Sequence, residues 1–260
     1  MQDVCFFCVF ISLVVVYVIY FSIEHNESAS WSIGHRNLAK DGFLVFEYKD
    51  YAKAEKEAPE PLRRLAFGAL PAGYQFMDYS YSIKNATLST FHRDVTSSPQ
   101  IYAATNPVYT LILYKYEGCL LSLCPGSNYT YPFVYSQIYN ISGAAGTCFL
   151  FHSDLLHAGC FNNCEMRDII QYKIAHQDDM DKFTHLDGIS VEKEESTCED
   201  TLYNHFLRKC SYFFELPINT IFNPLLQKKH DDNGILAKIQ DYSSIKFYNN
   251  PGLTPPAQRL

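Results

Sequence analysis

The sequence predicts a mainly β protein with flanking helices, folded as an antiparallel sandwich or barrel such as a jelly roll. The chain holds 20 Tyr and 19 Phe among its 260 residues, and these residue types favour strands. Seven short apolar and β-branched runs follow one another without a helical period between them, at 74–83, 86–95, 107–118, 132–141, 146–151, 154–159 and 167–176. We therefore expect one domain over residues 37–260, with its β core at about 74–177.

The first 24 residues form an apolar segment. Val4–Ile23 is twenty residues long without a charged side chain, and as a helix it would match the thickness of a bilayer core. We expect an uncleaved signal-anchor that crosses the membrane, followed by a polar stalk over residues 25–36. Cleavage near residues 28–30 would instead release a secreted protein.

Sequons and cysteines indicate where the domain lies. Four Asn-X-Ser/Thr sequons begin at Asn26, Asn85, Asn128 and Asn140, and seven cysteines follow the apolar segment, which is typical of a lumenal or extracellular glycoprotein. Short-loop disulfides could join Cys119 to Cys124 and Cys160 to Cys164, Cys198 could reach Cys210, and Cys148 would be a buried thiol. The spacing does not favour a structural zinc site.

The remaining elements follow in chain order. Residues 37–48 read as a helix end and a strand entered through Asp41-Gly42, and residues 53–73 as an exposed, proline-broken connection with at most a short helix. A helical stripe of Leu202, Phe206, Leu207, Cys210 and Phe213 lies in the C-terminal extension, residues 178–260. The net charge of −7, without a basic block, excludes nucleic acid as a partner.

The triplet His92-Arg93-Asp94 is the first chemical signal. It also opens the catalytic loop of protein kinases, but Pro99 stands where a kinase needs Asn, and no Asp-Phe-Gly follows. On a strand, His92 and Asp94 point to the same side and can reach one metal ion. Two imidazoles and one carboxylate are typical of non-haem Fe(II) oxygenases. The third ligand would come from "FLFHSDLLHAGC", which offers His157 and, as an alternative, His152.

His92-x-Asp94, then His157, then Arg167 ten positions on, resembles the Fe(II)- and 2-oxoglutarate-dependent dioxygenases, most of all the phytanoyl-CoA dioxygenase branch. The segments "LAKDGFLVF" and "GTCFLFHSDLLHAGCFNNCEMRDIIQYKIAH" share this likeness, which covers roughly residues 37–177. It implies a cupin-like double-stranded β-helix, with His92, Asp94 and His157 as iron ligands. Arg167 would bind the distal carboxylate of 2-oxoglutarate.

The chain departs from that family at Ile169, where many relatives carry a Ser or Thr that contacts the cosubstrate. The other cosubstrate contacts are therefore unassigned, with Tyr102, Thr110 and Tyr114 as candidates.

The resemblance implies a hydroxylase that uses O2 and 2-oxoglutarate, with ascorbate as a reductant, and releases succinate and CO2, and the apolar segment would anchor it in the membrane. Its substrate would be a lipid, another small molecule or a protein side chain. The alternatives are a non-catalytic jelly-roll or cupin-like binding ectodomain of a membrane glycoprotein, and a surface glycoprotein with a structural role. Neither the substrate nor the oligomeric state follows from the sequence.

Overall fold

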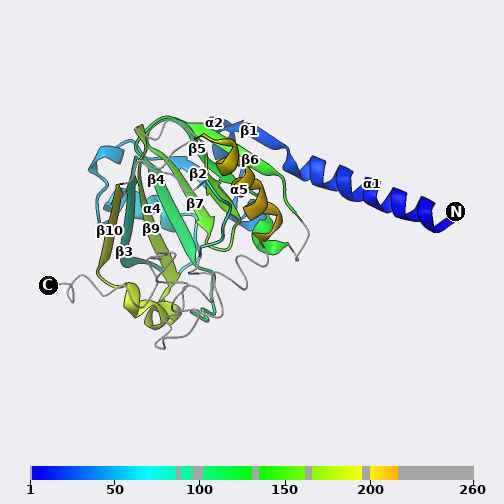
Figure 1. The fold of residues 1–260 in the computed structure, drawn as a ribbon. Coiled ribbons are helices and arrows are strands. Elements are labelled where there is room, and N and C mark those ends of the chain that lie inside the picture. Colours follow the sequence, from blue (N-terminus) through cyan, green and yellow to red (C-terminus); the bar gives the residue numbers. More distant parts are fainter. Residues whose placement is uncertain are drawn as a thin grey trace, which may run out of the picture.

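A computed structural model describes residues 2–85, 89–94, 96, 102–130, 135–161, 166–194 and 200–215. Within these residues, two sheets form the body of the protein, as Figure 1 shows. The four-stranded sheet has the order β1 (Glu24–Ser28), β6 (Ile138–Gly143), β5 (Gly118–Leu123), β8 (His157–Gly159). The six-stranded sheet has the order β10 (Ile189–Glu194), β3 (Tyr74–Lys84), β9 (Asp168–His176), β4 (Tyr109–Tyr114), β7 (Thr147–His152), β2 (Phe43–Glu47).

The core lies between the two sheets. Apolar side chains from both sheets meet there in one buried cluster, among them Phe43, Ile112, Leu121, Ile141 and Phe149. The central strands β4 and β7 are buried on both faces, which explains why "TLILY" and "TCFLF" are apolar without alternation.

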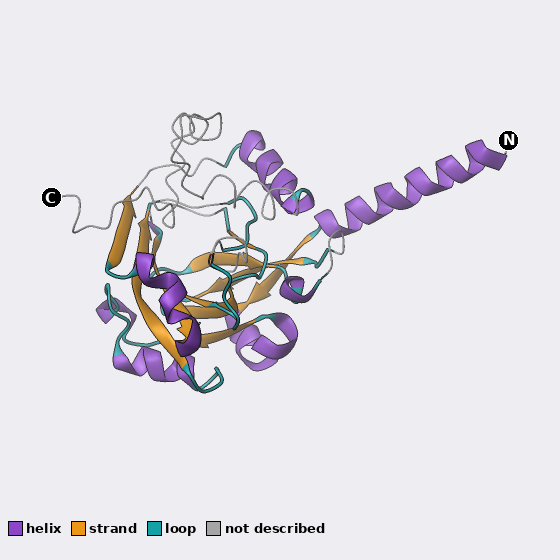
Figure 2. Cartoon of the chain, turned by 90° about the horizontal axis from the view of Figure 1, so that it is seen from below, coloured by secondary structure: helices purple, strands orange, loops and turns teal. Residues whose placement is uncertain are grey.

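Helices and short 3-10 turns surround the sheets. Helix α4 (Glu60–Phe67) covers the outer face of the six-stranded sheet, because its Leu62 and Ala66 pack in a cluster with Leu111 and Leu113 of β4. Helix α1 (Gln2–Ser22) extends away from the body (Figure 2). The remaining elements are α2 (Ala29–His35), α3 (Leu38–Asp41), η1 (Tyr51–Lys53), η3 (Ser127–Tyr129), η5 (Gln177–Leu186) and α5 (Leu202–Phe213).

The mainly β class with flanking helices is confirmed, and several details are corrected. The sheets are mixed, because β1 pairs with β6 and β10 pairs with β3 in parallel. Residues 24–36 form β1 and α2 of the folded domain, and not a stalk. Of the run at 86–95, the described part forms only an isolated bridge at His92. Among the described residues no helix combines the length and apolar character needed to cross a bilayer, so the predicted transmembrane helix is not supported.

In two of the four sequons, the side-chain amide of the asparagine is hydrogen-bonded or buried. Asn140 donates from Nδ2 to Glu24 Oε2 at 3.0 Å and accepts at Oδ1 from Ser122 Oγ at 2.5 Å, so its amide is held within a polar network. Both amide atoms of Asn128 are buried. Because a glycan is attached through Nδ2, a glycan at Asn128 would have to displace the groups that bury this amide. Asn26, on β1, is exposed.

One of the predicted cysteine pairs, Cys119–Cys124, is not formed. The described cysteines form no disulfide, and Cys124 is buried in an apolar cluster apart from Cys119. Cys148 is a buried thiol, as predicted, and burial raises its pKa. The partners Cys164 and Cys198 of the other two predicted pairs lie outside the described residues.

Candidate metal centre

The backbone brings His92 and Asp94 beside His157, although 63 positions separate Asp94 from His157 in the sequence. His92 and His157 exchange two hydrogen bonds, N to O, at 2.9 and 3.0 Å, and the Asp94 amide donates to Ser153 O at 2.8 Å. The segment is extended there, so Arg93 points to the opposite side, where it holds Glu215 with two bonds of 3.0 Å. The predicted alternation of His92, Arg93 and Asp94 is thus confirmed.

One ligand atom from each of His92, Asp94 and His157 lies within 4.8 Å of the other two. His157 Nε2 and Asp94 Oδ1 are 3.9 Å apart, and the two imidazole centroids are separated by 4.3 Å. Ligands that bind one transition metal at about 2.1 Å lie roughly 3–4 Å from one another. The three side chains therefore fit a single divalent cation with little movement.

Each imidazole is oriented by a backbone carbonyl. His92 Nδ1 bonds Thr90 O at 3.0 Å, and His157 Nδ1 bonds Leu155 O at 2.9 Å. A carbonyl only accepts, so Nδ1 carries the proton in both rings and Nε2 presents a lone pair, the tautomer that metal-binding histidines use. Burial lowers the pKa of His92, and burial together with His92 lowers the pKa of His157 to about 3. Both rings are neutral near pH 7.

A lysine that the sequence analysis missed holds Asp94. Lys173, 0% exposed on β9, donates from Nζ to Asp94 Oδ2 at 2.6 Å, and Thr110 donates to the same oxygen at 2.5 Å. Both partners of Oδ2 lie away from His157, which faces Oδ1. Burial alone would raise the pKa of Asp94, but the charge and hydrogen bond of Lys173, together with His157 and His92, outweigh it and hold that pKa well below its usual range. Thr110, which the sequence analysis offered as a candidate cosubstrate contact, is therefore a hydrogen-bond partner of Asp94.

Arg167 is 3% exposed, and its charge has no carboxylate beside it among the described residues. Its Nη1 lies 3.4 Å from Tyr116 Oη, its Nε has no hydrogen-bond partner there, and its guanidinium lies over the Tyr114 ring. The buried hydroxyl of Tyr114 also lacks a described partner, and burial raises its pKa, so it stays protonated. Three other largely buried arginines each hold a carboxylate: Arg36 with Glu27, Arg93 with Glu215, and Arg208 with Glu24.

An uncompensated buried cation is costly, so Arg167 and Tyr114 fit an anionic group that is not among the described residues. They lie on the face of the sheet that also carries the contacts of Asp94. Along β9, alternate positions carry Lys173, Gln171 and Ile169, which pair with Thr110, Ile112 and Tyr114 of β4. Arg167 is two positions further on. Arg167 therefore lies further along the same face of β9 and β4 as Lys173 and Thr110, the two residues that contact Asp94.

The remaining candidates from the sequence do not join the site. His152, the alternative ligand, accepts the Asp154 amide at its Nδ1 (3.1 Å) and lies against the Tyr109 ring, and it is not part of the cluster. Tyr102 stacks on Phe183 in a separate apolar cluster. The structure thus brings together His157, and not His152, with His92 and Asp94.

No protein-family model matches the chain, and no curated protein sequence matches it either. Solved structures with similar folds include SnoN, described as a non-haem α-ketoglutarate-dependent epimerase from nogalamycin biosynthesis, with 13% identity, a TM-score of 0.41 and coverage of 57% of this chain and 83% of SnoN. EctD from S. alaskensis, with bound Fe, has 14% identity, a TM-score of 0.40 and coverage of 55% and 75%.

EvdMO1 has 15% identity and a TM-score of 0.41, and the match covers 57% of this chain but only half of EvdMO1. The solved structures that resemble this chain thus include iron-binding and α-ketoglutarate-dependent non-haem enzymes. We base the proposed function on the side chains of this chain.

Proposed function

We propose that this protein is an Fe(II)- and 2-oxoglutarate-dependent oxygenase that hydroxylates its substrate. The observation that supports it most is the cluster of His92, Asp94 and His157, with both imidazoles in the metal-binding tautomer and all three ligand atoms within 4.8 Å. A purely structural ion pair between Asp94 and Lys173 would explain why a carboxylate is buried at this position. It would not explain why two neutral imidazoles converge beside that carboxylate.

Three ligands from one chain leave coordination positions for a cosubstrate and for O2. Bound Fe(II) would supply the activation of O2, coupled to the oxidative decarboxylation of 2-oxoglutarate to succinate and CO2. Arg167 would bind the distal carboxylate of 2-oxoglutarate bidentately, because a guanidinium stays charged at any relevant pH. Tyr114 would donate its hydroxyl hydrogen to the same carboxylate.

The chain's own contribution is orientation and the exclusion of water. Lys173 and Thr110 fix the rotation of the Asp94 carboxylate, and the carbonyls of Thr90 and Leu155 fix the two rings. Related halogenases carry a small residue in place of the ligand carboxylate, so the presence of Asp94 favours hydroxylation. A lipid, a small metabolite and a protein side chain remain candidate substrates.

The proposal is tested by binding and turnover together. His157→Ala should abolish Co(II) binding measured by calorimetry and succinate formation from 2-oxoglutarate, whereas His152→Ala, which removes the imidazole outside the cluster, should retain both. Arg167→Ala should keep the metal affinity of the wild type but require at least tenfold more 2-oxoglutarate, since a charge-assisted pair contributes about 1.5–3 kcal/mol.

Full succinate formation by His157→Ala would remove the metal assignment. Co(II) binding without any 2-oxoglutarate turnover in the wild type would favour the alternative, a binding domain without catalytic activity. Mass spectrometry of the substrate separates hydroxylation, which adds one oxygen atom, from a reaction that leaves its composition unchanged.

A further inference from the structure

Two cysteines that the sequence does not pair lie side by side on the outer face of the four-stranded sheet. Cys119 is the second residue of β5 and Cys160 directly follows β8, and these two strands are antiparallel neighbours. The thiols of Cys119 and Cys160 are close enough for each to shift the pKa of the other. Neither residue belongs to the metal centre.

A β-bulge explains how Cys119 reaches that face. The register of β5 against β6 shifts between Cys119 and Leu121, and both Leu120 and Leu121 point into the core. Two consecutive residues on one face interrupt the alternation of the strand. Without the bulge, Cys119 would point into the core with Leu121 and Leu123. With it, Cys119 points outward on the same side as Ser122.

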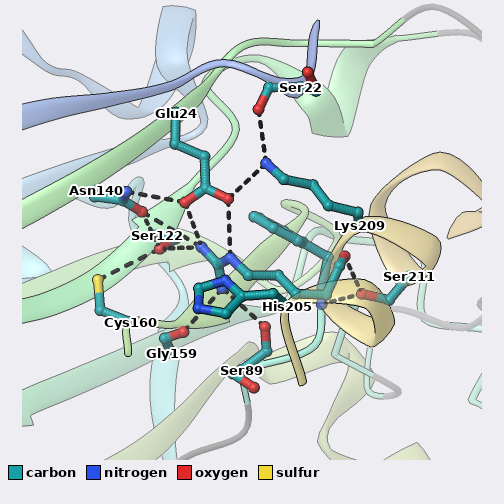
Figure 3. A network of polar contacts seen from close by, with 12 residues as sticks. Ser22, Glu24, Ser89, Ser122, Asn140, Gly159, Cys160, His205, Lys209 and Ser211 are labelled. Atoms are coloured by element: carbon teal, nitrogen blue, oxygen red, sulfur yellow. Dashed lines mark hydrogen bonds and ion pairs between the residues drawn. The ribbon is translucent and has the colours of Figure 1, made fainter. Parts of the chain in front are cut away.

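Cys160 lies on this outer face as well. Its Sγ is 3.4 Å from Ser122 Oγ. Figure 3 marks this contact with a dashed line. Residues on the same face of adjacent antiparallel strands have Cβ atoms about 4.5–5.5 Å apart, close to the 3.5–4.5 Å that a disulfide needs. Two cysteines on neighbouring strands and the same face can therefore be joined without moving either strand by much.

We propose that Cys119 and Cys160 form a reversible disulfide that links β5 to β8. Their environment gives the two thiols different roles. Cys160 is buried, whereas Cys119 is partly exposed and so can meet an oxidant. Ser122, which contacts Cys160, also accepts a bond of 2.7 Å from Arg208 Nη2, so a fixed positive charge lies near both sulfurs. Such a charge favours the thiolate, and the pKa of Cys119 is lowered, first by the hydrogen bond with Cys160.

The oxidant we propose is a small disulfide of the glutathione class. The Cys119 thiolate attacks one sulfur of glutathione disulfide, forms a mixed disulfide and releases one glutathione thiolate. Cys160 then loses its proton and attacks the Cys119 sulfur, so the Cys119–Cys160 bond forms and the second glutathione leaves. Two protein thiols are oxidised, and one glutathione disulfide is reduced to two thiols. The lumenal or extracellular location predicted from the cysteine count would supply this oxidant.

The link would act on the strand that begins with His157. Strand β8 lies at the edge of its sheet and is held there by three residue pairs with β5. A covalent bond next to Gly159 would limit its separation from β5. We therefore expect oxidation to raise the unfolding midpoint by on the order of 10 °C, the effect of closing a loop of about 40 residues.

The test uses full-length protein equilibrated with reduced and oxidised glutathione, then alkylated and mapped by mass spectrometry without reduction. We expect a peptide pair linked through Cys119 and Cys160. Cys160→Ala should lose the link and retain glutathione on Cys119, and Cys119→Ser should show neither. Cys148→Ser, which removes the buried thiol of β7, should leave the link intact. Each variant is checked for the wild-type circular dichroism spectrum.

Three results would overturn the proposal. One is a link between Cys119 and Cys124, the pair suggested by their spacing. Another is wild-type protein that carries glutathione on Cys119 without any link at every ratio of the two glutathiones. The third is an unfolding midpoint that oxidation leaves unchanged although the link has formed. These outcomes do not depend on metal binding or on 2-oxoglutarate turnover.

Discussion

The carboxylate of Asp94 offers two oxygen atoms, and the fold uses them differently. Oδ2 accepts from Lys173 and Thr110, and Oδ1 faces His157 at 3.9 Å. A lysine without solvent access is stabilised by a negative partner, and Asp94 is that partner. The ammonium group thus balances the carboxylate in protein without metal and limits its rotation.

Lys173→Met should destabilise metal-free protein by about 3–5 kcal/mol, because it leaves Asp94 buried beside no cation. Added Co(II) would supply the missing positive charge, so it should raise the unfolding midpoint of the variant more than that of the wild type. Thermal denaturation with and without Co(II) measures both effects.

Lys84→Met is the matched control, since Lys84 pairs with Glu192 at the surface, where solvent screens the ion pair and its loss has little effect on stability. An equal Co(II) shift in the wild type and in Lys173→Met would show that Lys173 does not serve the metal centre.

At the scale of residues, the cluster of His92, Asp94 and His157 could be predicted from the sequence. The residues that hold Asp94 in place could not. His92, Asp94, His157 and Arg167 are recognisable because their types and spacing match a known chemistry. Lys173 looks in sequence like any strand lysine, and only the pairing of β9 with β4 places it against Thr110 and Asp94. Its apolar neighbours in "IIQYKIA" were the one available signal of burial.

Helix α5 holds the segments of both candidate histidine ligands from outside the sheet. Arg208, 1% exposed, donates from Nη1 to Ser89 O at 2.8 Å and to Gly159 O at 3.0 Å, and Ser211 Oγ accepts the Phe91 amide at 2.7 Å. Figure 3 shows these contacts beside the ion pair with Glu24. The helix therefore fixes the chain three residues before His92 and two residues after His157.

Arg208→Met should lower the free energy of unfolding by about 3–5 kcal/mol, because it leaves Glu24 without its main partner and removes two carbonyl contacts. It should also weaken Co(II) binding, since both histidine segments lose their support. Urea denaturation and calorimetry measure the two effects.

His205→Ala, on the exposed side of α5, is the control and should change the stability by less than about 0.5 kcal/mol. The double variant Glu24→Gln/Arg208→Met should be more stable than Arg208→Met alone. Unchanged metal affinity in Arg208→Met would mean that α5 supports the fold but does not position the ligands.

The sequence predicted helix α5 but the wrong buried face. Leu202 and Phe206 of the apolar stripe are exposed, whereas Arg208, Ser211 and Tyr212 are buried. Apolar periodicity cannot anticipate that an ion pair and carbonyl contacts will direct an arginine inward. The parallel strand β10, "ISVEKE", was also missed. Its polar residues suit an exposed edge strand, so the sequence carries little of the apolar pattern by which strands are recognised.

At the scale of the whole molecule, lowering the pH should reduce the free energy of unfolding, because Glu24 becomes protonated. Burial would raise the pKa of Glu24, but Arg208 and Lys209 outweigh it and lower the pKa from 4.5 to about 2. A carboxyl whose pKa falls on folding stabilises the folded state above its unfolded pKa. That contribution is lost as the pH falls from about 4.5 to about 2.

We expect the free energy of unfolding to decline across that range, and Glu24→Gln to show a shallower decline with a lower value at pH 7. Urea titrations at a series of pH values measure it. Identical slopes in the two proteins would exclude Glu24 as the source, which leaves other carboxyls such as Asp94 and Asp179, whose pKa values are also lowered.

Strand β1 has a consequence for the order of events during synthesis. Glu24 is bound to Asn140 and to Arg208, so the earliest strand of the body obtains its partners only when the middle and then the far end of the described chain have left the ribosome. Nascent chains shorter than about 210 residues lack Arg208 and therefore cannot complete these contacts of β1. Their incomplete sheets would depend on chaperones until Arg208 has been synthesised.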